Sequence, residues 1–262
     1  MSQVTSEPKL GSEQVGNGRH RIVMVHGFTQ TRASWRQSAE SLVSTLPDTN
    51  CLLVDLPGHG QSSTVSADLT ESARLLAAVG GRAVYVGYSL GARVLLQLMA
   101  DQPDVVMAAV SVSGTAGIAD DAERRARANA DDELARRIEA IGVAAFLREW
   151  LAQPLFASLS PAQAMVDERL TNTAKGLADS LRRSGQGRQR SLWNELAAFD
   201  RPFLAVAGAH DLKYVELAGR LAGIVRHGTL AVIPECGHSV NSECPAELVA
   251  EIARWYRLVV SG

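Results

Sequence analysis

The sequence predicts an α/β fold in which a mostly parallel sheet is flanked by helices. Six short apolar segments recur along the chain, and helical stretches such as 90–100 and 246–256 lie between or after them. The segments are continuous apolar runs, as is typical of parallel strands covered on both faces. Strands that alternate with helices indicate a parallel sheet. The candidate strands are residues 21–26, 51–56, 83–87, 107–113, 203–207 and 229–233.

Composition and charge limit the kinds of partner that the chain can have. Of its 262 residues 46% are hydrophobic, which suits one large α/β domain or two small ones. The net charge of −2 gives no general attraction to nucleic acid or to anionic lipid, so we expect neither partner. The three cysteines (Cys51, Cys236 and Cys244) show no C-x-x-C spacing, which argues against a disulfide framework or a zinc site.

The first residues of the chain are polar and lack the apolar core of a signal peptide. We expect a flexible tail over residues 1–19. No apolar run is long enough to cross a bilayer, so we expect a cytoplasmic protein with no membrane span. Nothing in the sequence indicates the oligomeric state.

Residues 118–198 interrupt the alternation of strands and helices. This interval has no strand candidate, and its apolar positions fit amphipathic helices with dense charge of both signs. It follows the fourth recognised strand, and would sit above the carboxyl ends of the strands, where α/β sheets bind ligands. We therefore expect a helical cap on a core formed by residues 20–117 and 199–262. The alternative is an insertion with a structural role alone.

A candidate nucleophile lies between the third strand and its helix. Residues 87–91 read Gly-Tyr-Ser-Leu-Gly, which matches G-x-S-x-G in the strand–turn–helix setting that this motif needs. Its glycines allow a tight turn that projects the hydroxyl of Ser89, and the N–H groups that follow face the reacting atom. The pattern predicts an activated serine.

A serine nucleophile needs a base, and the base needs an acid that orients it. Asp211 comes just after the strand at 203–207, and His238 lies on the loop after the strand at 229–233. Their chain order and their positions at strand ends fit a Ser89–His238–Asp211 triad. The other histidines suit the role of base less well because they lie in the tail, in turns or next to other motifs: His20, His26, His59, His210 and His227.

Together these features resemble the α/β-hydrolase superfamily over residues 20–258. The resemblance implies an oxyanion hole formed by the N–H of Phe28, after the first strand, and the N–H of Leu90, after the serine. The loop at residues 54–62 resembles the D-x-P-G-x-G-x-S loop of the superfamily, and its Asp55 is expected to be architectural.

Arg93 lies one helical turn after Ser89 and should face broadly the same way. Its helix is otherwise apolar, and a buried guanidinium is costly unless it is paired. One interpretation is an ion pair with an acid of the cap. The other is an anion-binding group at the floor of the pocket, because the planar guanidinium holds a carboxylate in a bidentate geometry.

Six stretches resemble a narrower family, 2-succinyl-6-hydroxy-2,4-cyclohexadiene-1-carboxylate (SHCHC) synthase of menaquinone biosynthesis. They are GYSLGARV, GIADDAERRARANADDELA, FLREWLAQPLFASLSPAQ, ERLTNTAKGLADSL, GAHDLKY and IPECGHSVNSECP. The resemblance implies that the triad acts as a base which eliminates pyruvate from 2-succinyl-5-enolpyruvyl-6-hydroxy-3-cyclohexene-1-carboxylate. It implies a small polycarboxylate substrate and no metal or organic cofactor. The implied substrate-binding residues are Arg93, Arg127, Arg169, Tyr88 and Trp150.

The chain departs from this family at three places and leaves other activities open. Ala92 replaces the second glycine after the serine–leucine pair, Thr29 and Gln30 follow Phe28 where a glycine is frequent, and Asn241 stands where many members have histidine. A carboxylesterase or a C–C hydrolase would use the same triad, as would a cofactor-free haloperoxidase. A hydrolase fold that only binds ligands is a further alternative.

Overall fold

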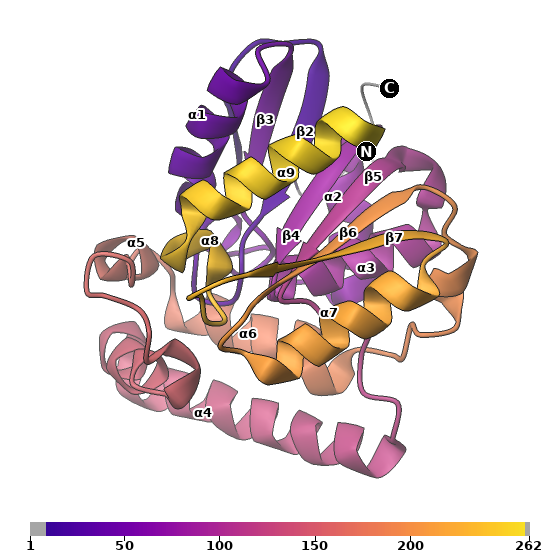
Figure 1. The fold of residues 1–262 in the computed structure, drawn as a ribbon. Helices are drawn as coiled ribbons and strands as arrows, with labels where there is room; N and C mark the ends of the chain where they lie inside the picture. Colours follow the sequence, from indigo (N-terminus) through magenta and orange to yellow (C-terminus); the bar gives the residue numbers. More distant parts are fainter. Residues whose placement is uncertain (1–8, 260–262) are drawn as a thin grey trace, which may run out of the picture.

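The protein is built around a seven-stranded sheet in the order β1-β3-β2-β4-β5-β6-β7 (Figure 1). The computed structural model describes residues 9–259. All neighbouring strands run parallel except β1, which is antiparallel to β3. The strands are β1 (Ser12–Val15), β2 (His20–Val25), β3 (Thr49–Val54), β4 (Ala83–Tyr88), β5 (Val106–Val112), β6 (Pro202–Gly208) and β7 (His227–Ile233).

The α/β fold with a mostly parallel sheet is confirmed, and all six predicted strands are present within two residues of their expected ends. The predicted tail is wrong over its second part, because β1 pairs with β3 and Leu10 is buried. β1 has only four residues and half-exposed side chains, so it carries little apolar signal. Residues 1–8 lie outside the part of the chain that the structure describes.

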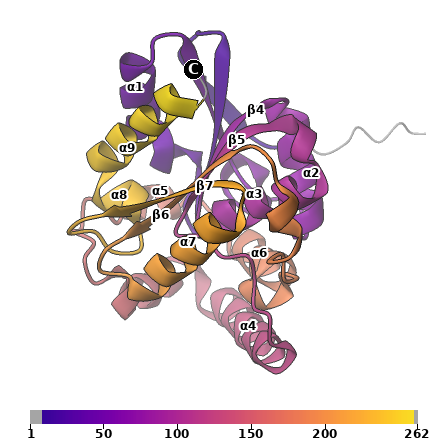
Figure 2. The same cartoon turned by 45° about the vertical axis from the view of Figure 1, so that its right-hand side comes forward.

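Helices cover both faces of the sheet, as Figures 1 and 2 show. The helices α1 (Arg36–Thr45) and α9 (Pro245–Val259) pack on one face around Trp35, Leu42 and Ile252. The other face is covered by α2 (Leu69–Gly80), α3 (Leu90–Asp101) and α7 (Leu212–Ile224).

The edge strand β7 does not fit the expectation that every strand is covered on both faces. Leu230 is 43% exposed and Val232 is 39% exposed. β7 is an edge strand that pairs with β6 alone, so its apolar side chains are covered only in part. The apolar run therefore predicted the strand correctly, but the expectation that both of its faces are buried was wrong.

Between β5 and β6 the chain is helical, and Figure 1 shows these helices grouped at one end of the sheet. They are α4 (Asp121–Leu151), α5 (Val166–Arg169) and α6 (Ala174–Ser184). We call residues 118–198 the cap. α4 begins where the Asp120 carboxylate accepts the N–H of Glu123, and it kinks at Gly142, whose φ of +76° is non-helical. Ile138, Phe146 and Leu177 form a small core between α4 and α6.

Within the described residues, the three cysteines are free and no helix has the length and hydropathy needed to cross a membrane. Burial raises the pKa of Cys51 to about 12, which keeps this thiol protonated at neutral pH. Cys51 is thus an inert part of the core.

Candidate active site

The turn that carries Ser89 depends on two glycines. Ser89 has φ +52° and ψ −106° and begins α3 directly after β4. A Cβ on Gly87 would lie 2.4 Å from the carbonyl oxygen of Gly91, and one on Gly91 would lie 2.3 Å from that of Val25. Only glycine at both positions lets the helix pack this closely on the strands. The motif therefore places the serine hydroxyl at the carboxyl edge of the sheet.

The three residues predicted as a triad lie within hydrogen-bonding reach of one another. His238 Nε2 is 3.3 Å from Ser89 Oγ, and His238 Nδ1 is 2.7 Å from Asp211 Oδ2. The side chain of His238 is 3% exposed and that of Asp211 is 10% exposed. The ring of Tyr214 packs on the imidazole with centroids 4.5 Å apart. This geometry suits a base that is held by an acid and aimed at a serine.

The loop of His238 is anchored by a residue that the sequence patterns did not reveal. The carboxylate of Glu243, at the end of α8 (Val240–Glu243), accepts the N–H groups of Gly237 and Ser239 at 2.7 and 2.8 Å. The Ser113 hydroxyl donates to the carbonyl of His238 at 2.8 Å. The backbone on both sides of the imidazole is therefore fixed.

Two other histidines are buried near the turn after β2 and serve structure. His26 Nε2 accepts the N–H of Leu56 at 3.0 Å, and His59 Nε2 accepts the N–H of Thr29 at 3.3 Å. Burial lowers the pKa of His26 to about 4 and that of His59 to about 3, so both are neutral at pH 7. Asp55, as expected, is architectural: its carboxylate is fully buried and binds Arg32.

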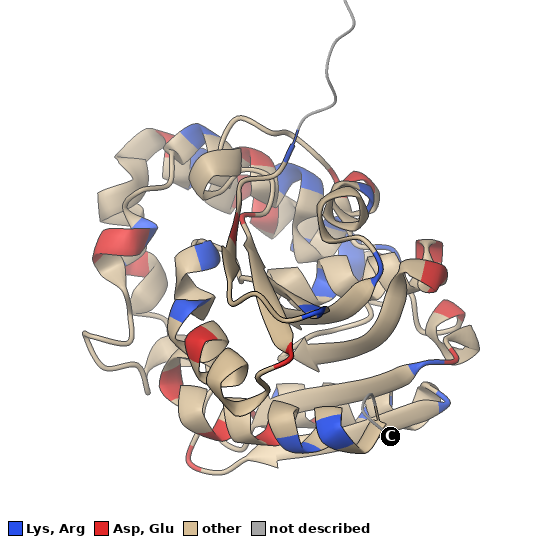
Figure 3. Ribbon diagram, turned by 90° about the horizontal axis from the view of Figure 1, so that it is seen from above, with Lys and Arg blue, Asp and Glu red and all other residues tan. Residues whose placement is uncertain are grey.

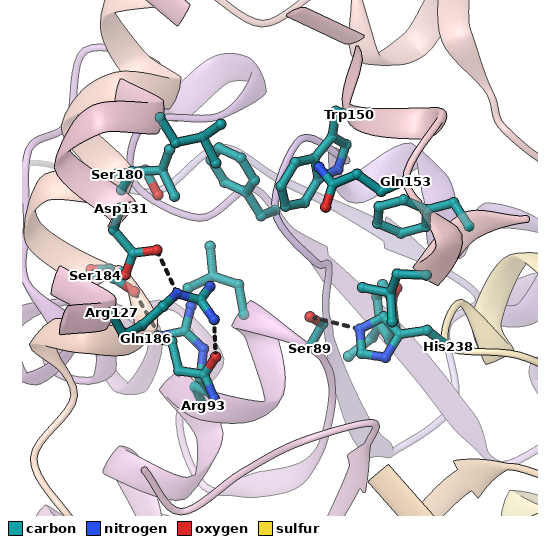
Figure 4. A pocket seen from close by; sticks show the side chains of 18 of the residues that line it. Ser89, Arg93, Arg127, Asp131, Trp150, Gln153, Ser180, Ser184, Gln186 and His238 are labelled. Carbon is teal, nitrogen blue, oxygen red and sulfur yellow. Dashed lines mark hydrogen bonds and ion pairs between the residues drawn. The ribbon is translucent and has the colours of Figure 1, made fainter. Parts of the chain in front are cut away.

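All ten predicted site residues line one cavity of about 550 Å³ between the sheet and the cap. Figure 4 shows Ser89 and His238 on one side of it and the arginines Arg93 and Arg127 on the other. The ten residues are Phe28, Tyr88, Ser89, Leu90, Arg93, Arg127, Trp150, Arg169, Asp211 and His238.

The arginines of the cavity differ in their partners. Arg93 donates to the carbonyl of Ser184 at 2.7 Å, and no carboxylate of residues 9–259 forms an ion pair with it. The expected alternative of a direct ion pair with a cap acid is therefore not seen, although the nearby charge of Asp131 in the cap partly opposes the lowering of the Arg93 pKa by burial. Burial lowers the pKa of Arg93 to about 10, so it stays charged at pH 7. Arg127, in contrast, pairs with Asp131 at 2.8 Å (Figure 4).

Arg169 is almost fully buried at the end of α5. Its Nε donates to the carbonyl of Ala164 at 2.7 Å, and its Nη1 donates to the hydroxyl of Thr29. Burial lowers its pKa from the usual range. Nη2 donates no hydrogen bond to a described residue, which leaves its two N–H groups for a ligand.

Some residues of the cavity were not predicted. Lys213 lies two positions after Asp211 and adds a cation to the lining. It belongs to GAHDLKY, one of the stretches that carry the family resemblance, but only its charge could have marked it as a site residue. Gln186 accepts from Arg127, and Asp131 accepts both from Arg127 and from the N–H of Gly187. These contacts bring α4 and the segment after α6 together, which no local pattern reports.

The excess of cations is a local property of the cavity. Figure 3 shows Lys and Arg interspersed with Asp and Glu over the outer helices. Arg93, Arg127, Arg169 and Lys213 line the cavity against Asp131 and Asp211. Across residues 9–259 no three His, Cys, Asp or Glu side chains come together as a metal site would require.

Comparisons with known proteins agree with this architecture. The model of the alpha/beta hydrolase family matches residues 22–252. The chain is 33% identical to the SHCHC synthase of Enterobacter sp. strain 638, over 90% of this chain and 92% of that protein. It is 30% identical to a putative SHCHC synthase of Bacillus subtilis strain 168, over 87% of each chain.

Solved structures show the same fold at lower identity. MenH from S. aureus has a TM-score of 0.86 at 24% identity and covers 94% of this chain and 98% of its own. A thermophilic esterase from Thermogutta terrifontis has a TM-score of 0.82 at 22% identity and covers 95% of this chain and 93% of its own. With a family model that spans most of its length, the chain belongs to the α/β hydrolase family.

Proposed function

We propose that the protein is an SHCHC synthase, a lyase that eliminates pyruvate from 2-succinyl-5-enolpyruvyl-6-hydroxy-3-cyclohexene-1-carboxylate in menaquinone biosynthesis. The observation that carries this proposal is Arg93. Its guanidinium lies in the cavity of the Ser89–His238 pair and is hydrogen-bonded to a backbone carbonyl, with no carboxylate of residues 9–259 in a direct ion pair with it. A desolvated cation of this kind is stabilised by an anionic ligand. A neutral acyl chain would not supply one.

The substrate suits a cavity lined by cations because it carries three carboxylates: on the ring, on the succinyl arm and on the enolpyruvyl group. Arg93, Arg127 and Arg169 would bind these carboxylates, and Tyr88 and Trp150 would line the remaining walls. Arginine is suited to this work because its planar fork binds carboxylate in a bidentate manner. Held in this way, the substrate presents one ring C–H to the base.

The elimination needs a base and an oxyanion site. His238, oriented by Asp211, accepts the proton of Ser89, and Ser89 Oγ removes the ring proton at C2, next to the succinyl ketone. The electron pair forms the C2–C3 double bond, the C3–C4 double bond moves to C4–C5, and the C5–O bond breaks. Enolpyruvate leaves and gains a proton to give pyruvate. The N–H groups of Phe28 and Leu90 would stabilise negative charge on the ketone oxygen.

The test is pyruvate release from freshly made substrate by wild type and by Ser89→Ala, after subtraction of spontaneous decay. Fast release that Ser89→Ala abolishes is expected. Release at the background rate by the wild type would refute the lyase proposal.

A serine esterase is the second candidate, because the same triad geometry suits acyl transfer. Turnover of a neutral aryl ester without pyruvate release would favour it. A protein that binds ligands without catalysis would show neither activity, and its Ser89 would resist serine-reactive probes.

A further inference from the structure

The turn after β2 carries the N–H that we expect to form one side of the oxyanion hole. The turn lies against the nucleophile, since a Cβ on Gly27 would be 3.4 Å from the Cβ of Ser89. The N–H groups of Phe28 and Leu90 donate no hydrogen bond within residues 9–259. Two such N–H groups suit a developing oxyanion, provided that their direction is fixed before the substrate binds.

The direction of the Phe28 N–H is tied to that of the Gly27 carbonyl. The two groups belong to one planar trans peptide, so they point in opposite directions. The Gly27 carbonyl lies 2.8 Å from His26 Nδ1 and accepts the N–H of Gln30 at 3.1 Å. A group that holds this carbonyl therefore also holds the Phe28 N–H.

The contacts of His26 determine which of its ring nitrogens carries the proton. His26 Nε2 is 3.0 Å from the backbone nitrogen of Leu56, and a backbone N–H can only donate, so Nε2 carries no proton. The ring is fully buried, and burial lowers its pKa to about 4, so it is neutral at pH 7. Its one proton is therefore on Nδ1, which donates to the Gly27 carbonyl.

The backbone of His26 ties the same turn to the helix of the nucleophile. Its carbonyl accepts the N–H of Gly91 at 3.0 Å, and Gly91 directly follows Leu90, the second expected oxyanion donor. The N–H of Gly27, on the same peptide as the His26 carbonyl, donates to Gln30 Oε1 at 3.1 Å. The peptides on both sides of Gly27 are therefore held, and the imidazole of His26 holds the second of them.

We propose that His26 is a positioning residue for the oxyanion hole: its Nδ1–H holds the Gly27 carbonyl and thereby directs the Phe28 N–H. The inference rests on the proposed function only in taking Ser89 as the nucleophile and the Phe28 N–H as an oxyanion donor. It gives a buried histidine that is not the base a role in every reaction at Ser89.

A neutral fluorophosphonate tests the oxyanion hole without contacts to the arginines that would bind carboxylates. Ser89 gives its proton to His238, its Oγ bonds to phosphorus, and fluoride leaves while the phosphoryl oxygen occupies the oxyanion hole. The labelling rate of Ser89 should therefore fall when the Phe28 N–H is misdirected.

Two substitutions each remove one of the two hydrogen bonds of the imidazole. In His26→Gln, Oε1 can still accept the Leu56 N–H, but the donor to the Gly27 carbonyl is lost. In His26→Asn, Nδ2 takes the place of Nδ1 and can still donate to Gly27, but the Leu56 N–H loses its acceptor.

The labelling rates of the two variants should differ. We expect His26→Gln to slow labelling about 10-fold, less than the ~10²–10³-fold cost of losing an oxyanion donor outright, because the Gln30 N–H still holds the carbonyl. His26→Asn should label within about threefold of the wild type, since it keeps the donor that directs the Phe28 N–H. In pyruvate release, His26→Gln should lower kcat and leave KM unchanged.

His59 supplies the matched control. Its ring is also fully buried, its Nδ1 is 3.0 Å from the carbonyl of Pro57, and its Nε2 accepts the N–H of Thr29 at 3.3 Å. Neither contact involves the Gly27–Phe28 peptide. His59→Gln removes a buried Nδ1 donor just as His26→Gln does, yet it should label within about threefold of the wild type. Urea unfolding at pH 7.5 checks that each variant is folded.

NMR of the ring nitrogens tests the same contact in the wild type, without any substitution in His26. The proposal requires that the neutral ring of His26 carries its proton on Nδ1. His26 and His59 are the two rings that should stay neutral at pH 5, and the spectrum of His59→Gln shows which signal belongs to His26. A proton on Nε2 of His26 would overturn the positioning role.

The remaining outcomes distinguish this proposal from the proposed function. Wild-type labelling in His26→Gln, or equal rates in His26→Gln and His26→Asn, would overturn the positioning role, because a ring needed only for packing does not distinguish the two lost bonds. Rapid labelling of the wild type without pyruvate release would refute the lyase proposal and leave the positioning role standing. A wild type that resists the probe would refute the assignment of Ser89 as nucleophile, and the positioning role with it.

Discussion

Arg93 is the residue on which the choice between a polycarboxylate and a neutral substrate depends. Its guanidinium contacts a backbone carbonyl and no carboxylate of residues 9–259, and burial already disfavours its charged form. A bound carboxylate would therefore gain a strong, charge-assisted hydrogen bond. The same feature makes an esterase with neutral substrates hard to reconcile with this cavity.

Replacing Arg93 by alanine should reduce kcat/KM for the polycarboxylate by ~1.5–3 kcal/mol, the range for hydrogen bonds to charged groups. The loss should be absent for a neutral aryl ester. Steady-state kinetics on both substrates is the measurement. Arg226 is exposed and pairs with Asp200 away from the cavity, so Arg226→Ala is the matched control. Equal losses on both substrates would mean that Arg93 supports structure.

At the scale of elements, the strand–turn–helix unit of residues 83–101 shows how tightly packing constrains the site. A Cβ on Gly91 would meet the Val25 carbonyl at 2.3 Å, so β2 and α3 would have to separate. We expect Gly91→Ala to lower the free energy of unfolding by ~1–3 kcal/mol, as overpacking does. A shift of the serine by about 1 Å would also lower kcat on the order of 10²-fold.

Urea unfolding and steady-state kinetics test this expectation, with Gly223→Ala as the control. Gly223 lies in α7 and a Cβ there would meet nothing within 4 Å, so alanine should be neutral or stabilising by about 0.4–1 kcal/mol. A Gly91→Ala variant as stable and active as wild type would contradict the close approach of helix and strand.

Features set by interactions between residues close in sequence could be predicted, and features set by contacts between distant residues could not. Strands and the elbow were predictable because apolar runs and G-x-S-x-G are local patterns with one dominant structural solution. β1 was missed because four half-exposed residues carry no such pattern, and its pairing with β3 is set by the free sheet edge. The anchoring of Thr29 by Asn172 joins residues far apart in sequence, and no local signal reports it.

At the scale of the whole molecule, the cavity exists only where core and cap meet. Ser89, Asp211 and His238 come from turns after β4, β6 and β7, whereas Arg127 and Arg169 come from α4 and α5. Without the cap, the predicted triad on the core would be exposed to water. The cap adds cations and, through Arg169 and Asn172, reaches down to the turn of Phe28. Residues of the core and of the cap therefore line the proposed substrate cavity together.

The buried pair His26 and His59 should make the whole molecule sensitive to acid. Their folded pKa values, about 4 and about 3, lie below the value of 6.5 expected for an exposed histidine, and their rings are 5.0 Å apart. Between pH 6.5 and these values the unfolded chain binds protons that the folded chain excludes. The two histidines therefore do not reduce the free energy of unfolding above pH 6.5, and they reduce it increasingly as the pH drops below that value. At pH 5 the loss should be about 2 kcal/mol for each histidine.

Urea unfolding between pH 5 and pH 7.5 measures this dependence, and His59→Gln isolates one member of the pair. Glutamine can still accept the N–H of Thr29 through Oε1 but does not titrate in this range, so the variant should lose about half of the pH slope. His227→Gln, which alters an exposed imidazole beside Asp200, should retain the part of the slope that His59 contributes. A His59→Gln variant with the wild-type slope would show that the acid sensitivity arises elsewhere, because the substitution removes the titrating group.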